Sequence, residues 1–296
     1  MRDAVRRLGI SGLLAFSLLL IGPALAAAES EFKPDQEFAL DEYIPIHIGP
    51  LDLSINKAVI YMLISATIAC VGCIWVIRGG LKLRPTGAQN IVELVYEFAE
   101  TNIARATLPT KVFARWFPYI ATLFVFILIN NLISFIPLPF GHERGWGGWA
   151  GSLPDLGLYA ATANINVTIA LTIMTFLFTH IEGVRQHGVG GYWNTLKPQG
   201  VKGFTKAFVF ALELLGQVLR LVSLSVRLFA NMLAGHLLII MAAGFVVLLG
   251  SFVGVLAIPF GVFFYFFEWV LVAGLQAFIF AMLSGIYIGF AAEAPH

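Results

Sequence analysis

Charged residues are scarce in this 296-residue sequence: 12% are Asp, Glu, Lys or Arg, whereas 59% are hydrophobic. A soluble domain of this size carries about 25% charged residues. The composition therefore excludes an ordinary soluble protein and indicates several membrane-crossing segments. The formal net charge is only +1, so no basic excess supports binding to nucleic acid.

Cysteine is nearly absent as well. Cys70 and Cys73 are the two cysteines, and both lie in one apolar run. Their spacing is compatible with a redox or metal pair, but no His or acidic residue lies nearby, which favours small packing residues. Glycine-rich phosphate loops and metal-ligand spacings are also missing. We expect no ATP site, cofactor or metal, and we interpret His180, Glu182 and His187 as an interfacial loop without metal.

Residues 1–26 have the pattern of a signal peptide. Arg2, Arg6 and Arg7 precede an apolar core that ends in Ala24-Leu25-Ala26, which is a small-residue cleavage site. An uncleaved first anchor is the alternative. Residues 27–56 are polar and acidic, as expected for an exported tail.

Long hydrophobic runs predict an all-α membrane protein with a single helical membrane domain over residues 57–292. Five spans are expected, at 57–77, 116–137, 161–182, 207–245 and 252–291. The last two far exceed the roughly 20 residues that cross a bilayer. We expect them to be tilted, bent, or partly interfacial.

The segment 86–108 predicts a different kind of helix. Its apolar residues recur at helical spacing, but Glu93, Glu97 and Glu100 interrupt them. This segment is amphipathic and too polar to span, so we expect it to lie on the membrane surface.

Loop charge predicts the orientation. Six Lys and Arg residues lie in 78–115 and four in 183–206, whereas 138–160 contains only Arg144. Basic loops remain in the cytoplasm. The N-terminus is therefore expected outside and the C-terminus inside, in the inner membrane of a bacterial cell.

Only two cations, Arg220 and Arg227, follow Lys206. A permanent charge in an apolar span costs roughly 3 kcal/mol on insertion scales, and guanidinium does not escape the cost by losing its proton. Arg227 is therefore expected to face a protein partner or water. Arg220, seven residues earlier, shares its face, although it can equally be a snorkelling residue near a span end.

Other polar groups lie at different depths in the last two spans. Asn231 shares the face of Arg227, and His236 lies about 13 Å further along the helix and points elsewhere. The last span contributes Glu268 and Gln276. A carboxyl group in such a run is expected to be neutral or paired, with His236 as the obvious partner. Asn231 and Gln276 can also be interhelical contacts, and His236 a core histidine. Span three adds polar residues near its outer end: Asn164, Asn166 and Thr168.

Several segments resemble subunit a of the bacterial F-type ATP synthase, whose mitochondrial counterpart is the sixth ATPase subunit. The similarity is carried most specifically by SLSVRLFANMLAGHLLI (223–239) and LQAFIFAMLSGIYI (275–288), and extends to 117–139, 161–176 and 89–103. The resemblance implies a stator subunit beside a rotating ring of c subunits, with two half-channels for protons and with peripheral-stalk b subunits as further partners. Nucleotide chemistry would then belong to other subunits.

The resemblance also implies residue roles. Arg227 would be the essential arginine that faces the ring carboxylate, with Asn231 and Gln276 beside it and Arg220 as a secondary basic residue. His236 stands where many members carry Glu, and Glu268 lies near where they carry His. Glu268 precedes Gln276 by eight residues where the family leads us to expect seven, which turns its side chain by about 100°. Asn164, with Asn166 and Thr168, would line a half-channel, without the Asp that some members carry.

Two other classes of function use similar residues. An ion-coupled secondary transporter predicts internal repeats and broken helices around a central site, and the sequence shows no repeat. A purely structural membrane anchor predicts that Arg227 can be changed without loss. The sequence leaves the choice between proton and sodium open.

Overall fold

The computed structural model describes residues 42–48, 51–52, 54–85, 87–136, 159–195, 204–248 and 250–293. The predicted signal peptide and residues 27–41 of the predicted tail lie outside these residues. Five helices are long and apolar enough to cross a membrane, as predicted from the hydrophobic runs. The chain is a multi-pass helical membrane protein.

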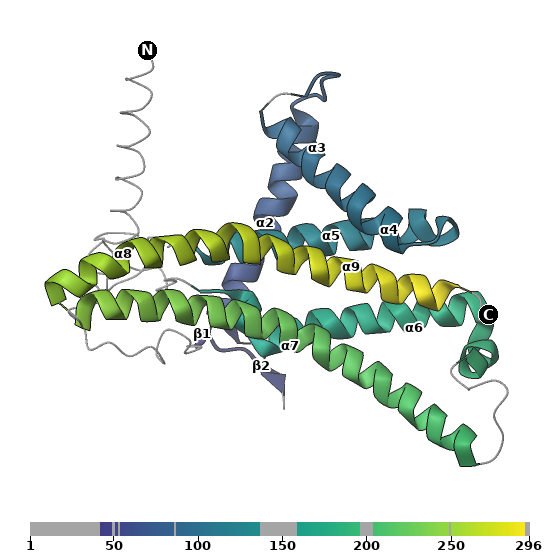
Figure 1. Ribbon diagram of the computed structural model, residues 1–296. Coiled ribbons are helices and arrows are strands. Elements are labelled where there is room, and N and C mark those ends of the chain that lie inside the picture. The colour runs from purple at the N-terminus through teal and green to yellow at the C-terminus, as the bar shows by residue number, and fades with distance from the viewer. Residues whose placement is uncertain are drawn as a thin grey trace.

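The first span is α2 (Lys57–Arg78). It begins where the Asn56 side chain accepts a hydrogen bond from the backbone N–H of Val59 at 3.1 Å, an ordinary N-cap. Only its first turns are buried, at Ala58, Tyr61 and Ser65. The helix then runs steeply away from the other spans (Figure 1), so its second half shows an apolar surface without a partner in the described chain.

Two pairs of short strands precede α2, and the sequence had not predicted them. β1 (Glu42–Ile44) pairs antiparallel with β4 (Ile55–Asn56), and β2 (His47–Ile48) pairs with β3 (Leu51–Asp52) between them. They form one small hairpin that leads into α2. Such a short pairing adds no layer to the helical fold.

The predicted amphipathic helix is interrupted. α3 (Ala88–Phe98) continues as a π-helical turn over Ala99–Ala104 and a last turn, α4 (Arg105–Thr107). The turn before α3 contains Gly87 at φ 61°, a conformation that glycine adopts readily. Gln89 closes this turn: its side chain exchanges two hydrogen bonds with the backbone of Lys82, at 3.0 and 3.1 Å.

α5 (Thr110–Ser134) and α6 (Ile165–Thr195) are both longer than predicted. α5 begins directly after Pro109 and therefore includes polar residues that the hydropathy of the run had excluded. α6 is kinked at Gly188 (φ 71°), so its last residues form a separate turn beyond the predicted span end.

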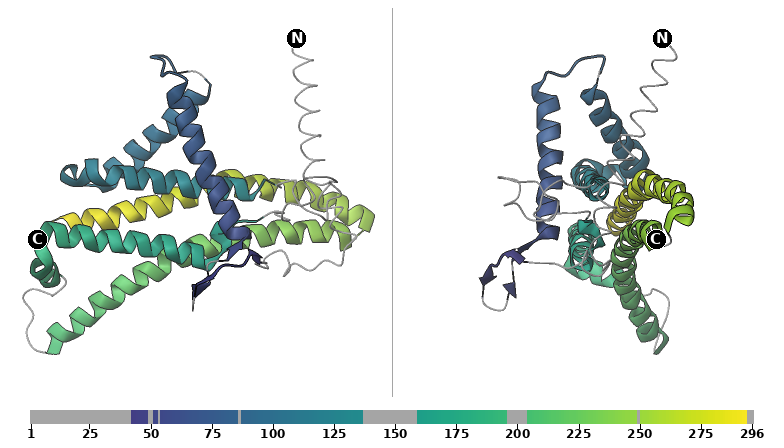
Figure 2. Two further views of the ribbon diagram at one scale, coloured as in Figure 1. Left: turned by 180° about the vertical axis from the view of Figure 1, so that it is seen from behind. Right: turned by 90° about the vertical axis from the view of Figure 1, so that its left-hand side faces the viewer.

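α7 (Phe204–Leu248) runs antiparallel to α8 (Gly250–Phe266), and α8 continues through a π-helical turn at Phe267–Val272 into α9 (Ala273–Ala292) (Figures 1 and 2). The 45 residues of α7 extend over roughly 68 Å. Since the hydrocarbon core is about 30 Å thick, α7 is far longer than a perpendicular crossing requires. Whether it is tilted, bent or partly interfacial stays a prediction.

The core lies between α5 and α9. Its fully buried side chains include Ile120, Ile127, Phe280 and Ile288. Small residues let the short helix α4 approach α9: Thr107 lies against Gly285 and Gly289 so closely that a β-carbon at either glycine would collide with it. This packing positions α9 and thereby Gln276.

An ion pair joins the first turns of α5 to the second half of α6. The Glu182 carboxylate is completely buried and lies 3.4 and 3.5 Å from Nη1 of Arg115, and it accepts a hydrogen bond of 2.6 Å from Gln186. A carboxylate that is buried without a partner is costly. The pair therefore ties the two helices together, in the cluster for which the sequence had indicated an interfacial loop.

Replacing Arg115 by methionine is expected to destabilise the membrane domain, by on the order of 2 kcal/mol, because Glu182 is left buried without its cation. Thermal unfolding of the purified protein measures this. Arg105→Met is the matched control, since the Arg105–Glu100 pair is largely exposed and such pairs contribute about 0 to 1 kcal/mol. Equal shifts for the two variants would refute the role of the buried pair.

Candidate functional site

Arg227 lies on an exposed stripe of α7. The side chains at this stripe are exposed and mostly small: Ser223, Arg227, Ala230 and Ala234. No hydrogen bond or ion pair to Arg227 occurs among the described residues. Small side chains let another helix approach closely in a membrane. The stripe is therefore suited to contact with a helix of a partner, provided that this helix carries a group that can pair with the guanidinium of Arg227.

The other predicted members of this face are placed differently. Arg220 is exposed, and its guanidinium carbon lies 5.8 Å from the ring centroid of Tyr287 on α9. Asn231 is half-buried, whereas Gln276 is buried, with 7% of its surface exposed. Arg220 thus contacts the chain's own α9, while Arg227 remains open to a partner.

His236 is buried where α7 passes the end of α5. Its Nδ1 lies 3.0 Å from the carbonyl oxygen of Met232, and its Nε2 lies 3.3 Å from that of Ser134. The ring also packs against Phe135, with 4.7 Å between the centroids. Both nitrogens thus have backbone partners, and the structure forms no direct hydrogen bond between His236 and Glu268.

Glu268 is buried beside His236, in the π-helical turn. Its Oε2 has no hydrogen-bond partner, and a β-carbon built on Gly235 would lie 2.5 Å from that oxygen. The carboxyl group therefore occupies the space that a side chain at Gly235, the neighbour of His236, would take. Glu268 is thus close to His236 without a direct hydrogen bond, and coupling between the two side chains would need a small polar group between them.

The π-helical turn explains the eight-residue interval between Glu268 and Gln276. A π-helical turn adds one residue to a turn of α-helix. The eight residues therefore span about the same rotation as seven in an undisturbed α-helix. The π-helical turn at Phe267–Val272 contains the one additional residue of this interval. Glu268 therefore points toward the face of the helix on which a seven-residue interval would place it.

The three polar residues at the start of α6 have local partners. Asn164 precedes α6, and its Oδ1 accepts a hydrogen bond of 2.9 Å from the backbone of Asn166, so it serves the N-terminus of the helix. Thr168 is fully buried and donates to the carbonyl oxygen of Ile165 at 3.0 Å. Asn166 is the exposed member of the set. Their role in a half-channel stays a prediction.

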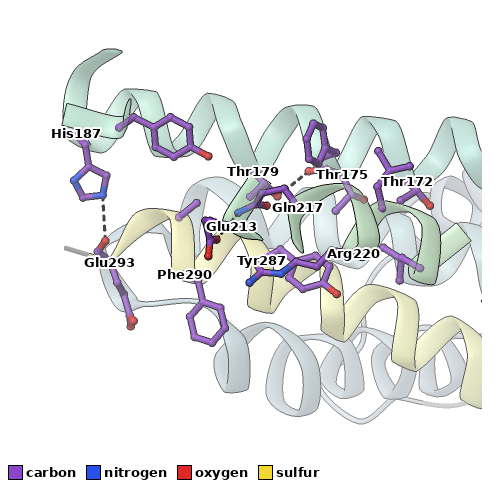
Figure 3. Close-up of a pocket in the computed structure, with 15 residues that line it drawn as sticks. Thr172, Thr175, Thr179, His187, Glu213, Gln217, Arg220, Tyr287, Phe290 and Glu293 are labelled. Atoms are coloured by element: carbon purple, nitrogen blue, oxygen red, sulfur yellow. Dashed lines mark hydrogen bonds between the residues drawn. The ribbon is translucent and has the colours of Figure 1, made fainter. Parts of the chain in front are cut away.

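A polar cavity of about 330 Å³ opens on the other side of Arg227, between α6, α7 and α9 (Figure 3). Sequence reasoning identified only Arg220 among its polar walls. The missed polar residues are Thr172, Thr175, Thr179, His187, Tyr192, Glu213, Gln217, Tyr287 and Glu293. Glu213 accepts a hydrogen bond of 3.2 Å from Gln217, and both also border a second, mainly apolar cavity.

Two polar regions thus lie on opposite sides of Arg227 along α7. Glu213 precedes it by roughly 21 Å of helix, and His236 follows it by roughly 13 Å. The threonine stripe of α6 and the interval between Glu213 and Gln217 were visible in the sequence as spacings of three and four residues. Groups that can carry protons therefore lie on both sides of the fixed positive charge of Arg227. This order suits a proton relay that is interrupted at Arg227.

Comparisons with known proteins identify the family of the chain. The family model described as ATP synthase A chain matches residues 59–289. The chain is 34% identical over 274 residues to ATP synthase subunit a of Bradyrhizobium diazoefficiens, covering 90% of this chain and 100% of that protein. It is 33% identical over 278 residues to ATP synthase subunit a 1 of Brucella anthropi, covering 89% and 98%.

A third relative is ATP synthase subunit a of Myxococcus xanthus, 34% identical over 251 residues, with 84% of this chain and 76% of that protein covered. The range of the family model runs from the first turn of α2 into α9 and includes Arg227, His236 and Glu213. The chain therefore belongs to the ATP synthase A chain family, the family of subunit a of the F-type ATP synthase.

Proposed function

We propose that the exposed Arg227 is the point at which this chain, the proton-channel stator subunit of a rotary F-type ATP synthase, acts on a ring of c subunits. One observation carries the proposal: a cation that pairs with none of the described residues lies on an exposed stripe of α7, between two polar regions at different positions along that helix. A proton cannot pass straight between them because the field of the guanidinium repels it. It must instead leave the chain, travel on the ring and return.

Arg227 would set the charge of the ring carboxylate. An opposite charge within about 4 to 6 Å favours the ionised carboxylate. A protonated carboxyl group of the c-subunit ring that approaches Arg227 therefore gives up its proton to the half-channel that it meets first and becomes a carboxylate. After it passes, it takes a proton from the other half-channel.

The two half-channels would use different groups. On the outer side, His236 and Glu268 are buried next to each other where α5 ends, with Asn166, Asn164 and Thr168 as candidate lining at the start of α6. On the inner side, the cavity beside Glu213 is large enough to hold water. Asn231 and Gln276 would flank Arg227, and Arg220 would border the inner cavity.

The remaining partners and the orientation follow as proposals. The positive-inside rule places the basic segments 78–115 and 183–206 in the cytoplasm, which puts the cavity inside and His236 outside. The exposed apolar side chains of α2 and α3, among them Val71, Trp75 and Leu94, suit membrane lipid or the b subunits of the peripheral stalk. Residues 1–26 would direct export of the N-terminus.

Purification from the bacterial membrane tests the assignment. The chain should co-purify with a ring of small hairpin subunits that carry a mid-membrane carboxyl group. The complex, reconstituted in vesicles, should make ATP from an imposed proton gradient. An isolated chain that transports a solute by itself would instead support an ion-coupled secondary transporter.

Changing Glu213 to glutamine should slow proton passage through the inner half-channel. The carboxyl is the acid that lines both inner cavities, and loss of a group that transfers protons lowers a rate on the order of tenfold or more. ATP-driven acidification of vesicles measures the effect.

Glu97→Gln is the control for this change, because Glu97 lies exposed on α3, away from the cavities. It removes a carboxylate without touching the inner half-channel. Equal pumping in the wild type and the Glu213→Gln complex would exclude Glu213 from the proton path.

A further inference from the structure

The C-terminal end of α5 is closed by side chains from two other helices. A helix leaves its last carbonyl groups without partners inside the helix. At the end of α5, Trp269 Nε1 donates to Leu132 at 3.1 Å, and the Tyr265 hydroxyl donates to Phe135. The Ser134 carbonyl oxygen between them lies 3.3 Å from His236 Nε2.

These groups are buried together. Ser134 and Phe135 are at most 1% exposed, and His236 is 4% exposed. A buried carbonyl group without a hydrogen bond is costly. Each of the three carbonyls thus depends on its own side-chain donor, and the ring of His236 serves the middle one.

The Met232 carbonyl lies four residues earlier on the helix that carries the ring, whereas the Ser134 carbonyl is supplied by another helix. An N–H on Nε2 donates to the Ser134 oxygen. The end of α5 therefore fixes the orientation of the His236 ring.

Among the residues that the structure describes, few other charged or titratable groups lie around His236. The π-helical turn and α8 bring Glu268 and Tyr265, α7 itself carries Arg227 nine residues earlier, and the last two turns of α5 contain no titratable side chain. Glu268 approaches through the gap at Gly235. The backbone of α5 is thus the constant partner of the ring, in either charge state of Glu268.

We propose that Tyr265 and Trp269 are positioning residues for His236 and act through the end of α5. They hold the carbonyls on both sides of Ser134, so that the Ser134 oxygen points at Nε2. The imidazole takes up one proton from the outer side and passes one proton on toward the carboxylate of the c-subunit ring. The inference rests on the proposed function.

The test uses Trp269→Phe and Tyr265→Phe in the assembled complex. Each change removes one donor but keeps an aromatic ring. ATP synthesis is measured in vesicles as the outer pH is varied. Because a loosened terminus no longer fixes the imidazole of His236, the pH profile of ATP synthesis should shift by about one unit, which is a tenfold change in proton affinity.

Trp116→Phe is the matched control. Trp116 is also buried, and its indole nitrogen has no hydrogen-bond partner, so its profile should match the wild type. In a His236→Gln background, Trp269→Phe should cause no further shift. This comparison of Trp269→Phe with and without His236 distinguishes the positioning of His236 from general damage to the fold.

Two results would overturn the inference while leaving the proposed function intact: unshifted profiles in both variants, or a Trp269→Phe shift that persists without His236. Failure of the wild-type complex to make ATP would instead refute the proposed function. If Trp269→Phe does not assemble, as seen by loss of the ring subunit, Tyr265→Phe alone decides.

Discussion

Replacing Arg227 by alanine should abolish ATP synthesis and ATP-driven proton pumping while the complex stays assembled. The guanidinium makes no hydrogen bond or ion pair within the described chain, so its removal costs the fold little. The ring carboxylate, however, loses the cation that would keep it ionised between the half-channels. We expect residual rates at background, a loss of at least about 100-fold.

Arg227→Lys separates charge from geometry in the same assay. Lysine keeps a cation but presents a single ammonium and can lose its proton when it is poorly solvated, whereas guanidinium stays charged. It should therefore recover little activity. Arg105→Ala, which removes an exposed arginine of α4, should leave both activities near wild type.

Replacing His236 or Glu268 by alanine should each reduce ATP synthesis on the order of 100-fold, because each would carry a proton in the outer half-channel. The double variant should lose scarcely more than either single variant. Residues that share one network have coupling energies of about 0.5 to 3 kcal/mol. Independent losses that multiply in the double variant would contradict a common path.

A steric variant tests the same contact without removing either side chain. Gly235→Ala places a methyl group where the Glu268 carboxyl lies and should displace it. Gly216, on the same helix, has no neighbour within 4 Å of such a methyl group. Gly216→Ala should therefore leave synthesis unchanged, while Gly235→Ala should approach the loss seen for Glu268→Ala.

The sequence predicted the membrane helices well because a run of apolar residues is a local signal. The predicted bounds of α2 and α7 lie within a few residues of the structure. The start of α5 was placed six residues late, because the polar residues after Pro109 lower the hydropathy without ending the helix. The hairpin before α2 was missed because strands of two or three residues leave no periodic pattern.

The candidate site was only partly accessible from sequence. Helical spacing placed Arg227 and Asn231 on one side of α7, and the eight-residue interval before Gln276 indicated an irregularity. The π-helical turn that accommodates it depends on packing against α5, which spacing along one helix does not contain. The same holds for Ser134, whose carbonyl became a partner of His236 only through the tertiary fold.

The inner cavity shows the opposite case. Thr172, Thr175 and Thr179, which line it, recur along α6 at helical spacing, as Glu213 and Gln217 do on α7. That pattern predicts facing polar stripes. Without the fold, the stripes could not be assigned to each other, and only Thr168, which precedes them on α6 and does not line this cavity, was singled out.

Cross-linking tests most directly whether the stripe around Arg227 faces the ring. Cys70 and Cys73 are first replaced by alanine, and one cysteine is placed at Ala230, an exposed position next to Arg227. A ring subunit with a cysteine one helical turn from its carboxyl group should then form a disulfide with it in the assembled complex. A cysteine at Leu177, exposed on α6, should form none. Absence of the cross-link at 230, or equal cross-linking at 177, would contradict the account.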